Sequence, residues 1–371
     1  TGLTSVTIGN GVTSIGDYAF CNCTGLMSVI IPNSVEGVSD FSFYGCSNLT
    51  NVSLGTNVGY VNDGAFANCA NLEQFVCYAK DVPQNCNNQY TEYGEYLGTN
   101  PFENSLIEYA TLYVPDESVE DYCMDENWGR FGTIKGISSL MKAVVSPDGS
   151  TITFYFGEED GSRQGTTYTI DGTASTPEWL ANAATITKAV FDPSFAFARP
   201  TTTQRWFSGM KNLKTIEGIE NLNTSDVTIM SYMFLNCQSL ETLDLSHFDT
   251  RKLDKMGYML QGCTNLKSVD LTGFETAACT SFYQMFKNCS SLESLDLSPL
   301  TITEGVESRY MLNGCTVLKN LTIPETAANL NNSSFVTVGT SDAPCELHAP
   351  EGFDFGTDTS GAFQWKSGWF Y

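Results

Sequence analysis

Histidine and basic residues are scarce in this chain of 371 residues. The two histidines, His247 and His348, stand far apart and outside any recognisable motif, so neither a Ser-His-Asp nor a Cys-His catalytic site is predicted. Lysine and arginine together number 18 against 42 acidic residues, which gives a net charge of −24. Such a charge argues against nucleic acids and anionic membranes as partners.

Long apolar runs and a leader sequence are also missing. The chain has no run of 18 apolar residues, so the sequence predicts no transmembrane segment within it. No signal-peptide pattern is visible, and the chain starts at Thr1, at the boundary of a repeat and without methionine. We therefore expect a fragment or a processed product whose signal or anchor lies upstream.

A 26-residue repeat fills the C-terminal half of the chain. Its coils carry the segments MFLNCQSLETLDL, MLQGCTNLKSVDL, MFKNCSSLESLDL and MLNGCTVLKNLTI. One cysteine recurs in the same slot of each coil: Cys237, Cys263, Cys289 and Cys315. A fixed period of this size is typical of a solenoid, in which each repeat buries its apolar side only against its neighbours.

A second, 23-residue repeat opens the chain. The segments LTSVTIGNGVTSIGDYAFCNC, LMSVIIPNSVEGVSDFSFYGC and LTNVSLGTNVGYVNDGAFANC start at Leu3, Leu26 and Leu49. The final cysteine of each segment occupies the same slot as the cysteines of the later array. The sequence therefore predicts two repeat arrays whose coils are built alike.

Each coil contains a strand pattern that is flanked by turns. The pattern L-x-x-L-x-L predicts a short strand, and stacked strands would pair in parallel at about 4.8 Å. The residue before the cysteine slot is always glycine or asparagine, which tolerate the left-handed backbone conformation that ends helices. We therefore expect a short helix before each slot, with Asp17, Asp40 and Asp63 as N-caps in the first array.

The cysteine slot is predicted to serve packing. One coil has Met210 there, and buried free cysteine is likewise a small apolar filler. Ladder disulfides are within reach by distance, but in-register side chains point the same way and the total of 13 cysteines is odd. No metal site is predicted, because no histidine accompanies the slot. The sequence leaves open the state of five other cysteines: Cys77, Cys86, Cys123, Cys279 and Cys345.

Two outward columns of the later array are charged. Position two of the strands alternates in sign and predicts a ladder of surface ion pairs: Lys214, Glu241, Lys267, Glu293 and Lys319. Position five is acidic in four successive coils, as Glu217, Asp244, Asp270 and Asp296, and is Thr322 in the last coil. These stacked carboxylates are either solvated surface or a stripe that binds a cation or a basic partner. A pair of glycosidase carboxylates is not favoured, because an open face offers no pocket to raise one pKa.

The segment NNQYTEYGEYLG is a second candidate binding region. It places Tyr90, Tyr93 and Tyr96 at three-residue spacing, and tyrosines combine contact area with a polar tip. The segment is either a contact for sugar or protein, or an apolar lid on the end of the first array.

Both arrays resemble known families. LTSVTIGNGVTSIGDYAFCNCTGL is similar to the BspA-like leucine-rich repeats of bacterial surface proteins, and residues 110–134 resemble the cap that closes such arrays. TITFYFGEEDGSR, ITKAVFDPSFAFARPTTTQRWFSGM and the 26-residue repeats resemble a second repeat family of bacterial surface proteins. The predicted fold class is an α/β repeat: two tandem leucine-rich-repeat-like solenoids of short parallel strands, with short helices or turns in each coil. The domains would be residues 1–138, with a C-terminal cap, and 139–371, with an N-terminal hairpin cap and a C-terminal cap.

The resemblance implies an exported, surface-anchored protein without enzymatic activity or cofactor. We expect a monomer at the cell surface that mediates protein–protein interaction or adhesion, with an extracellular host or microbial protein as partner. A carbohydrate-binding module with a glycan partner and a passive spacer that displays another domain are the alternatives. No catalytic residue is implied, since neither family has an established active site.

Overall fold

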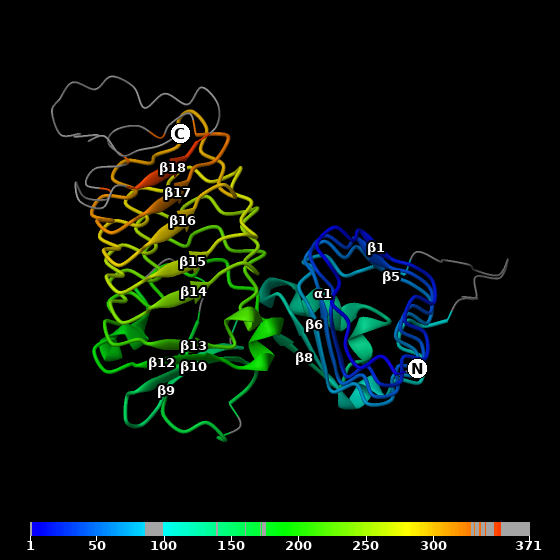
Figure 1. The fold of residues 1–371 in the computed structure, drawn as a ribbon. Helices are drawn as coiled ribbons and strands as arrows, with labels where there is room; N and C mark the ends of the chain where they lie inside the picture. The colour runs from blue at the N-terminus through cyan, green and yellow to red at the C-terminus, as the bar shows by residue number, and fades with distance from the viewer. Residues whose placement is uncertain are drawn as a thin grey trace. The chain divides into compact units, whose positions relative to one another are not determined.

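The computed structural model divides the chain into two compact units, Thr1–Ser139 (unit 1) and Leu140–Tyr371 (unit 2). Both are made of stacked coils with parallel strands and little helix, as in a leucine-rich-repeat-like β-solenoid (Figure 1). The structure describes residues 2–85, 99–138, 140–159, 161–170, 172, 176–327, 330, 334, 338 and 345–349.

Unit 1 contains two parallel ladders. The longer sheet has the order β2 (Ser28–Ile30), β4 (Asn51–Leu54), β6 (Gln74–Cys77), β7 (Thr111–Val114) and β8 (Thr133–Gly136). The shorter sheet joins β1 (Ser14–Ile15), β3 (Gly37–Val38) and β5 (Tyr60–Val61). Val29 pairs with Val52, and Val52 with Phe75, which is the register that the repeat of the first array predicted.

Aromatic packing closes the end of unit 1. Its short helices are η1 (Ile107–Tyr109), η2 (Asp116–Ser118), α1 (Val119–Met124) and η3 (Trp128–Arg130). Tyr122 and Trp128 are buried and donate hydrogen bonds to the carbonyls of Ala79 (2.9 Å) and Pro83 (3.1 Å). Helix α1 is the only α-helix in the described part of the chain, and no helix there is long and apolar enough to span a membrane.

Unit 2 begins with an antiparallel hairpin on which the coils stack. Strands β9 (Met141–Val145) and β10 (Thr151–Phe156) form the hairpin, and β11 (Thr166–Thr169) pairs antiparallel with β9. Strands β12 (Lys188–Phe191) and β13 (Thr215–Glu217) then add in parallel. The short helices η4 (Glu178–Asn182), η5 (Pro193–Phe197) and η6 (Ile219–Asn221) lie between these strands in sequence.

The remaining strands of unit 2 follow one another up the stack (Figure 1). They are β14 (Thr242–Asp244), β15 (Ser268–Asp270), β16 (Ser294–Asp296), β17 (Asn320–Thr322) and β18 (Glu346–His348). Leu243 pairs with Val269, and Leu295 with Leu321, so the register predicted from the repeat of the later array is confirmed. We call the outward side of β13–β17 the strand face.

The expectation of a short helix in each coil is wrong. Residues 17–22 and their equivalents form consecutive turns, and Asp17, Asp40 and Asp63 therefore cap no helix. Every second N–H group in the turn segment donates its hydrogen bond to a carbonyl of the next coil. Phe234 N donates to Met259 O (2.8 Å), and Asn236 N donates to Gln261 O (2.7 Å). The intervening N–H groups close tight turns, as Leu235 N does on Tyr232 O (3.1 Å). Because half the donors bond to the neighbouring coil, the repeated i−4 bonds of a helix cannot form.

We call this side of unit 2 the turn face. It comprises the turn segment of each coil: residues 202–210, 229–237, 255–263, 281–289 and 307–315. The predicted left-handed residues before the cysteine slot are confirmed in all eight coils: Asn22, Gly45, Asn68, Gly209, Asn236, Gly262, Asn288 and Gly314. A second left-handed position, four residues earlier, was not predicted: Tyr18, Phe41, Gly64, Arg205, Tyr232, Tyr258, Gln284 and Tyr310.

At the position before the cysteine slot, asparagine and glycine alternate from coil to coil for a steric reason. A Cβ added to Gly262 would collide with Oδ1 of Asn236, and one added to Gly314 would collide with Oδ1 of Asn288. Each of these asparagines therefore bends over the coil that follows, where only glycine leaves room. The step from Asn68 to the left-handed Asn104, across the long coil of unit 1, does not follow this alternation.

The cysteine slot lies in the core, which confirms the packing interpretation. All the described cysteines are free, and the slot thiols of unit 2 are fully buried. Each is close enough to donate to a carbonyl of the preceding coil, as Cys263 Sγ does to Phe234 O (3.1 Å) and Cys289 Sγ to Leu260 O (3.2 Å). Burial raises the pKa of the Cys263 thiol to about 12. Of the cysteines left open, Cys77, Cys279 and Cys345 are buried, Cys123 is exposed, and Cys86 lies outside the described residues.

Candidate functional site

The predicted acidic column lies on the strand face. Glu217, Asp244, Asp270 and Asp296 are the last residues of β13, β14, β15 and β16, and all four are exposed. Asp244 pairs in register with Asp270. The parallel stack therefore brings carboxylates of neighbouring coils to one edge of the strands, as the repeat predicted.

Three of these carboxylates also close the turn that follows their strand. Asp244 Oδ1 accepts hydrogen bonds from the backbone N (3.0 Å) and the hydroxyl (2.7 Å) of Ser246. Asp270 Oδ1 accepts from the N (2.9 Å) and the hydroxyl of Thr272, and Asp296 Oδ1 from Ser298 N (2.8 Å). These are Asx-turns, which let the chain leave the strand without unpaired N–H groups.

The Asx-turns have an electrostatic consequence. The hydroxyl and the N–H of Ser246 hold the pKa of Asp244 below its ordinary value, because both donors stabilise the charged carboxylate. The sequence signal was the run Asp-Leu followed by Ser or Thr, which sequence reasoning treated only as stacked charge. Asp is thus useful to the fold here, independently of any ligand.

Two ion pairs of the ladder predicted at position two form, whereas Lys214 joins no ion pair in the described part of the chain. Lys267 Nζ lies 2.6 Å from Glu241 Oε2, and Lys319 Nζ lies 2.8 Å from Glu293 Oε2. All four side chains are more than half exposed, so solvent screens each pair and the pairs contribute little to stability. In the acidic column itself, Glu217 binds Lys188 in the same way (2.7 Å).

A groove of about 380 Å³ runs over the strand face. Asp244, Asp270 and Asp296 line it together with the other residues of β14 and β15 and with residues that follow the strands. Glu217 is not part of its lining. Tyr90, Tyr93 and Tyr96 lie outside the described residues, and no cluster of three or more His, Cys, Asp or Glu that could hold a metal occurs among the residues described.

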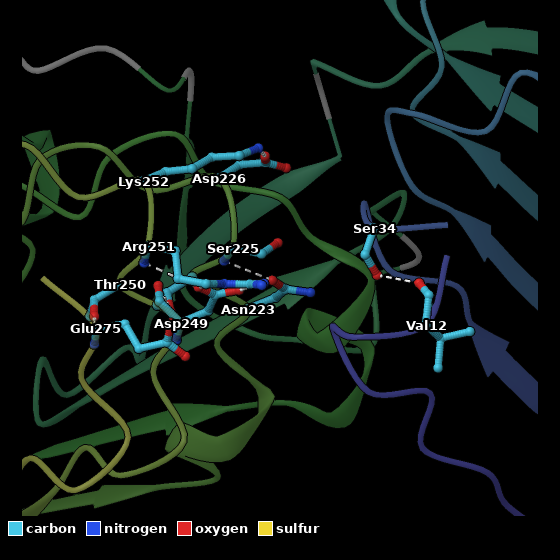
Figure 2. A network of polar contacts seen from close by, with 11 residues as sticks. Val12, Ser34, Asn223, Ser225, Asp226, Asp249, Thr250, Arg251, Lys252 and Glu275 are labelled. Atoms are coloured by element: carbon cyan, nitrogen blue, oxygen red, sulfur yellow. Dashed lines mark hydrogen bonds and ion pairs between the residues drawn. The ribbon is translucent and has the colours of Figure 1, made fainter. Parts of the chain in front are cut away.

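A polar network beyond the strands fixes how the coils of unit 2 stack. Buried Thr224 and Thr250 accept hydrogen bonds through Oγ1 from the backbone N of Asp249 (2.8 Å) and Glu275 (2.7 Å), each in the next coil. Figure 2 shows Arg251 lying along Asp249, with its guanidinium nitrogens 3.0 and 2.7 Å from the two carboxylate oxygens. These charges are paired within the protein, so the network is structural.

Two family models match the chain. Residues 1–127 match a BspA type leucine rich repeat region in six copies, and residues 201–323 match the family described as "Mycoplasma protein of unknown function, DUF285". No curated protein matches the chain.

Solved structures of bacterial repeat proteins are similar over most of their length. A leucine rich cell surface protein from Faecalibacterium prausnitzii is 17% identical, with 94% of this chain and 86% of that chain covered and a TM-score of 0.27. A leucine-rich repeat protein from Eubacterium ventriosum is 15% identical, with 93% and 92% covered and a TM-score of 0.29. At these identities and TM-scores neither likeness bears on function. On the family matches, the chain joins a BspA-type leucine-rich repeat region to a repeat domain of the DUF285 family.

Proposed function

We propose that the protein is a non-enzymatic bacterial surface protein that mediates protein–protein interaction or adhesion through its solenoid. The BspA-type repeat region supports this class of function. The observation that carries the proposal is the groove on the strand face, into which three coils present exposed carboxylates. We infer that its partner is a basic region of an extracellular host or microbial protein.

The chemistry of the groove favours a basic protein over a metal ion or a substrate. One oxygen of each aspartate is engaged by its own turn, so a row of single outward oxygens remains. A row surrounds no cation, whereas lysine and arginine side chains along a partner could each bind one carboxylate. A general acid needs a raised pKa, and the pKa of Asp244 is lowered instead.

Replacing Asp244, Asp270 and Asp296 together with asparagine tests the proposal. Asparagine retains an Oδ1 acceptor, so the Asx-turns should persist while the charge is removed. Surface plasmon resonance would measure binding to a Lys/Arg-rich peptide and to a panel of extracellular matrix proteins at several salt concentrations. We expect the variant to lose binding, and the parent's affinity to fall as salt rises.

The matched control removes the same charge from exposed positions of unit 1: Glu108→Gln, Glu120→Gln and Asp121→Asn. It should bind like the parent if the groove is the contact. Equal binding by the parent and by the strand-face variant would refute the proposed site.

The domain organisation and location are part of the same proposal. We infer that residues 1–138 and 139–371 are two tandem solenoid domains of a monomer held at the cell surface. The division into two compact units supports the boundary. Two separable unfolding transitions, each reproduced by one domain expressed alone, are expected in calorimetry.

The tyrosines of the NNQYTEYGEYLG segment are proposed as a second contact, for a glycan. A glycan array read with the parent and with Tyr93→Ala would test this alternative. Loss of a specific glycan signal in the variant would favour a carbohydrate-binding module, and absence of any ligand for every form of the protein would favour a spacer.

A further inference from the structure

Four tyrosines form a continuous column of rings on the turn face of unit 2. Tyr232 and Tyr258 stack with centroids 4.6 Å apart at 12°, and Tyr258 meets Tyr283 edge-on at 5.1 Å. Tyr283 meets Tyr310, also edge-on, at 6.2 Å. Tyr310 is 39% exposed and the other three tyrosines are half-buried, so the column is partly accessible to solvent.

The scaffold does not require tyrosine in this column. Tyr232, Tyr258 and Tyr310 adopt left-handed backbone conformations, with φ of 64°, 62° and 57°, which glycine or asparagine adopts at lower cost. Gly64 occupies the equivalent position in unit 1. In the turn segment of residues 281–289, Gln284 takes the left-handed position, yet the neighbouring Tyr283 supplies the ring. The row of rings is therefore continuous even where the sequence register of the tyrosine shifts.

Cations accompany the column. The Arg205 guanidinium lies 4.6 Å from the Tyr232 ring centroid, Arg309 lies 5.7 Å from that of Tyr283, and Lys287 lies 6.0 Å from that of Tyr310. Arg309 also pairs with Glu307 at 2.9 Å. Arg205 and Lys287 form no ion pair within the described part of the chain. They are thus available to an external anion.

The charge of this face is opposite to that of the whole chain. The five turn segments of unit 2 contain four basic residues and one acidic residue, whereas the chain has a net charge of −24. The equivalent segments of unit 1, residues 15–23, 38–46 and 61–69, contain three acidic residues and no basic one. Long-range repulsion from the remaining carboxylates is screened at physiological salt, so the local charge decides which ligand fits.

We propose that the tyrosine column, with Arg205 and Lys287, is a binding site for an acidic polysaccharide. Phenol rings and hydroxyls offer apolar edges and hydrogen-bonding groups that suit a sugar chain, and the cations suit its carboxylate or sulfate groups. The coils repeat at about 4.8 Å, close to the length of one pyranose unit. An extended acidic peptide fits less well, because its same-face side chains repeat at about 6.6 Å. The site lies on the turn face and does not depend on the groove of the strand face.

Binding of heparin, hyaluronan and neutral dextran to the full chain tests this inference, by calorimetry at low and at physiological salt. We expect heparin or hyaluronan to bind, with affinity that falls as salt rises, and dextran not to bind. A preference for heparin would identify sulfate as the recognised group, and a preference for hyaluronan would identify carboxylate. Poly-glutamate is the competitor that separates a glycan site from a peptide site.

Two sets of variants locate the site. Tyr258→Asn removes a ring from the middle of the column while asparagine tolerates the left-handed backbone, and we expect affinity to fall between about two- and tenfold. Arg205→Asn with Lys287→Gln removes the two cations that form no ion pair in the described part of the chain, leaves the rings in place and should abolish most of the salt dependence. The second set keeps the test decisive if Tyr258→Asn lowers stability.

Tyr18→Asn is the matched control. Tyr18 occupies the same left-handed position in unit 1 and stacks on Phe41 at 5.2 Å, but Asp17 and Asp40 lie in its coils instead of cations. It should bind glycan like the parent, as should the strand-face triple variant. No binding of either acidic glycan, equal binding of poly-glutamate, or equal losses in Tyr18→Asn and Tyr258→Asn would overturn the inference.

Discussion

The strand face and the turn face of unit 2 connect the same coils by different means. On the strand face, side chains make many of the connections: aspartates accept hydrogen bonds that close turns, and lysine–glutamate pairs link neighbouring strands. On the turn face, backbone conformation does it, through two left-handed residues per coil and alternate N–H groups that bond to the next coil. The strand face should therefore tolerate substitution better than the turn face, whose geometry leaves few residue types possible.

The largest effect is expected where the two faces share the core. Cys289→Asp would bury a charge without a partner and should destabilise unit 2 by about 3–5 kcal/mol, by analogy with uncompensated buried charges. Cys289→Ala should cost less, through a small cavity and a lost thiol contact. Urea unfolding followed by circular dichroism would measure both. Cys123→Asp, at an exposed position, is the control. A loss of stability in this variant as large as in Cys289→Asp would contradict the attribution of the loss to burial of the charge.

Alkaline pH should weaken the same core. The pKa of Cys263 and of Cys315 is raised to about 12 by burial, against an ordinary value of 9.0 in the unfolded chain. The unfolded state therefore loses these protons first, and stability that is complete below pH 9 should fall between pH 9 and about 12. Each thiol contributes about 1.4 kcal/mol per pH unit within that range. Urea midpoints measured for the parent and for Cys263→Ala would check this, since the variant should depend less on pH.

The turn face is tested by a pair of glycines. In Gly209→Ala the added Cβ would meet no atom within 4 Å. This variant should lower the free energy of unfolding by about 1–2 kcal/mol, because alanine is strained in the left-handed backbone conformation. Gly262→Ala has the same backbone cost and also collides with Asn236, so it should cost more. Thermal unfolding would compare them. Adding Asn236→Gly should restore Gly262→Ala to the level of Gly209→Ala, and failure of this rescue would rule out the steric explanation of the alternation.

The strand face should show the smallest effect. Asp270→Ala removes the Asx-turn to Thr272 and should cost about 0.5–1.5 kcal/mol, the net value of such hydrogen bonds. Asp270→Asn keeps the acceptor and should be close to neutral. The same unfolding assay applies to both. If the two variants are equally destabilised, the negative charge rather than the hydrogen bond supports the turn.

Much of the fold could be predicted, because it follows from periodicity. The strand register, the buried cysteine slot and the glycine or asparagine before it all repeat with the coil, and Met210 showed that the slot is apolar. The absence of a helix before the cysteine slot could not be predicted, because a turn that ends in a left-handed residue looks locally like a helix end. The second left-handed position was hidden because Tyr232 and Tyr258 are not residue types that favour it.

The candidate sites were less predictable than the fold. Parallel stacking alone placed Asp244 beside Asp270, but the bonds to Ser246 and Thr272 that give each aspartate a structural role depend on side-chain direction. The tyrosine column was missed because Tyr283 stands one residue out of register with the other three rings. Equivalent positions of the repeat do not show this column, because in one coil the ring comes from the residue before the equivalent position.

The alternation of asparagine and glycine limits how this array can change in length. Removing one whole coil, for instance 249–274, would bring Asn236 against Asn288, with two side chains where the geometry leaves space for one. Removing two coils would bring Asn236 against Gly314 and keep the pattern. In this part of the chain the unit of duplication or deletion is therefore a pair of coils, and shortened or lengthened forms should fold well only when they differ by an even number.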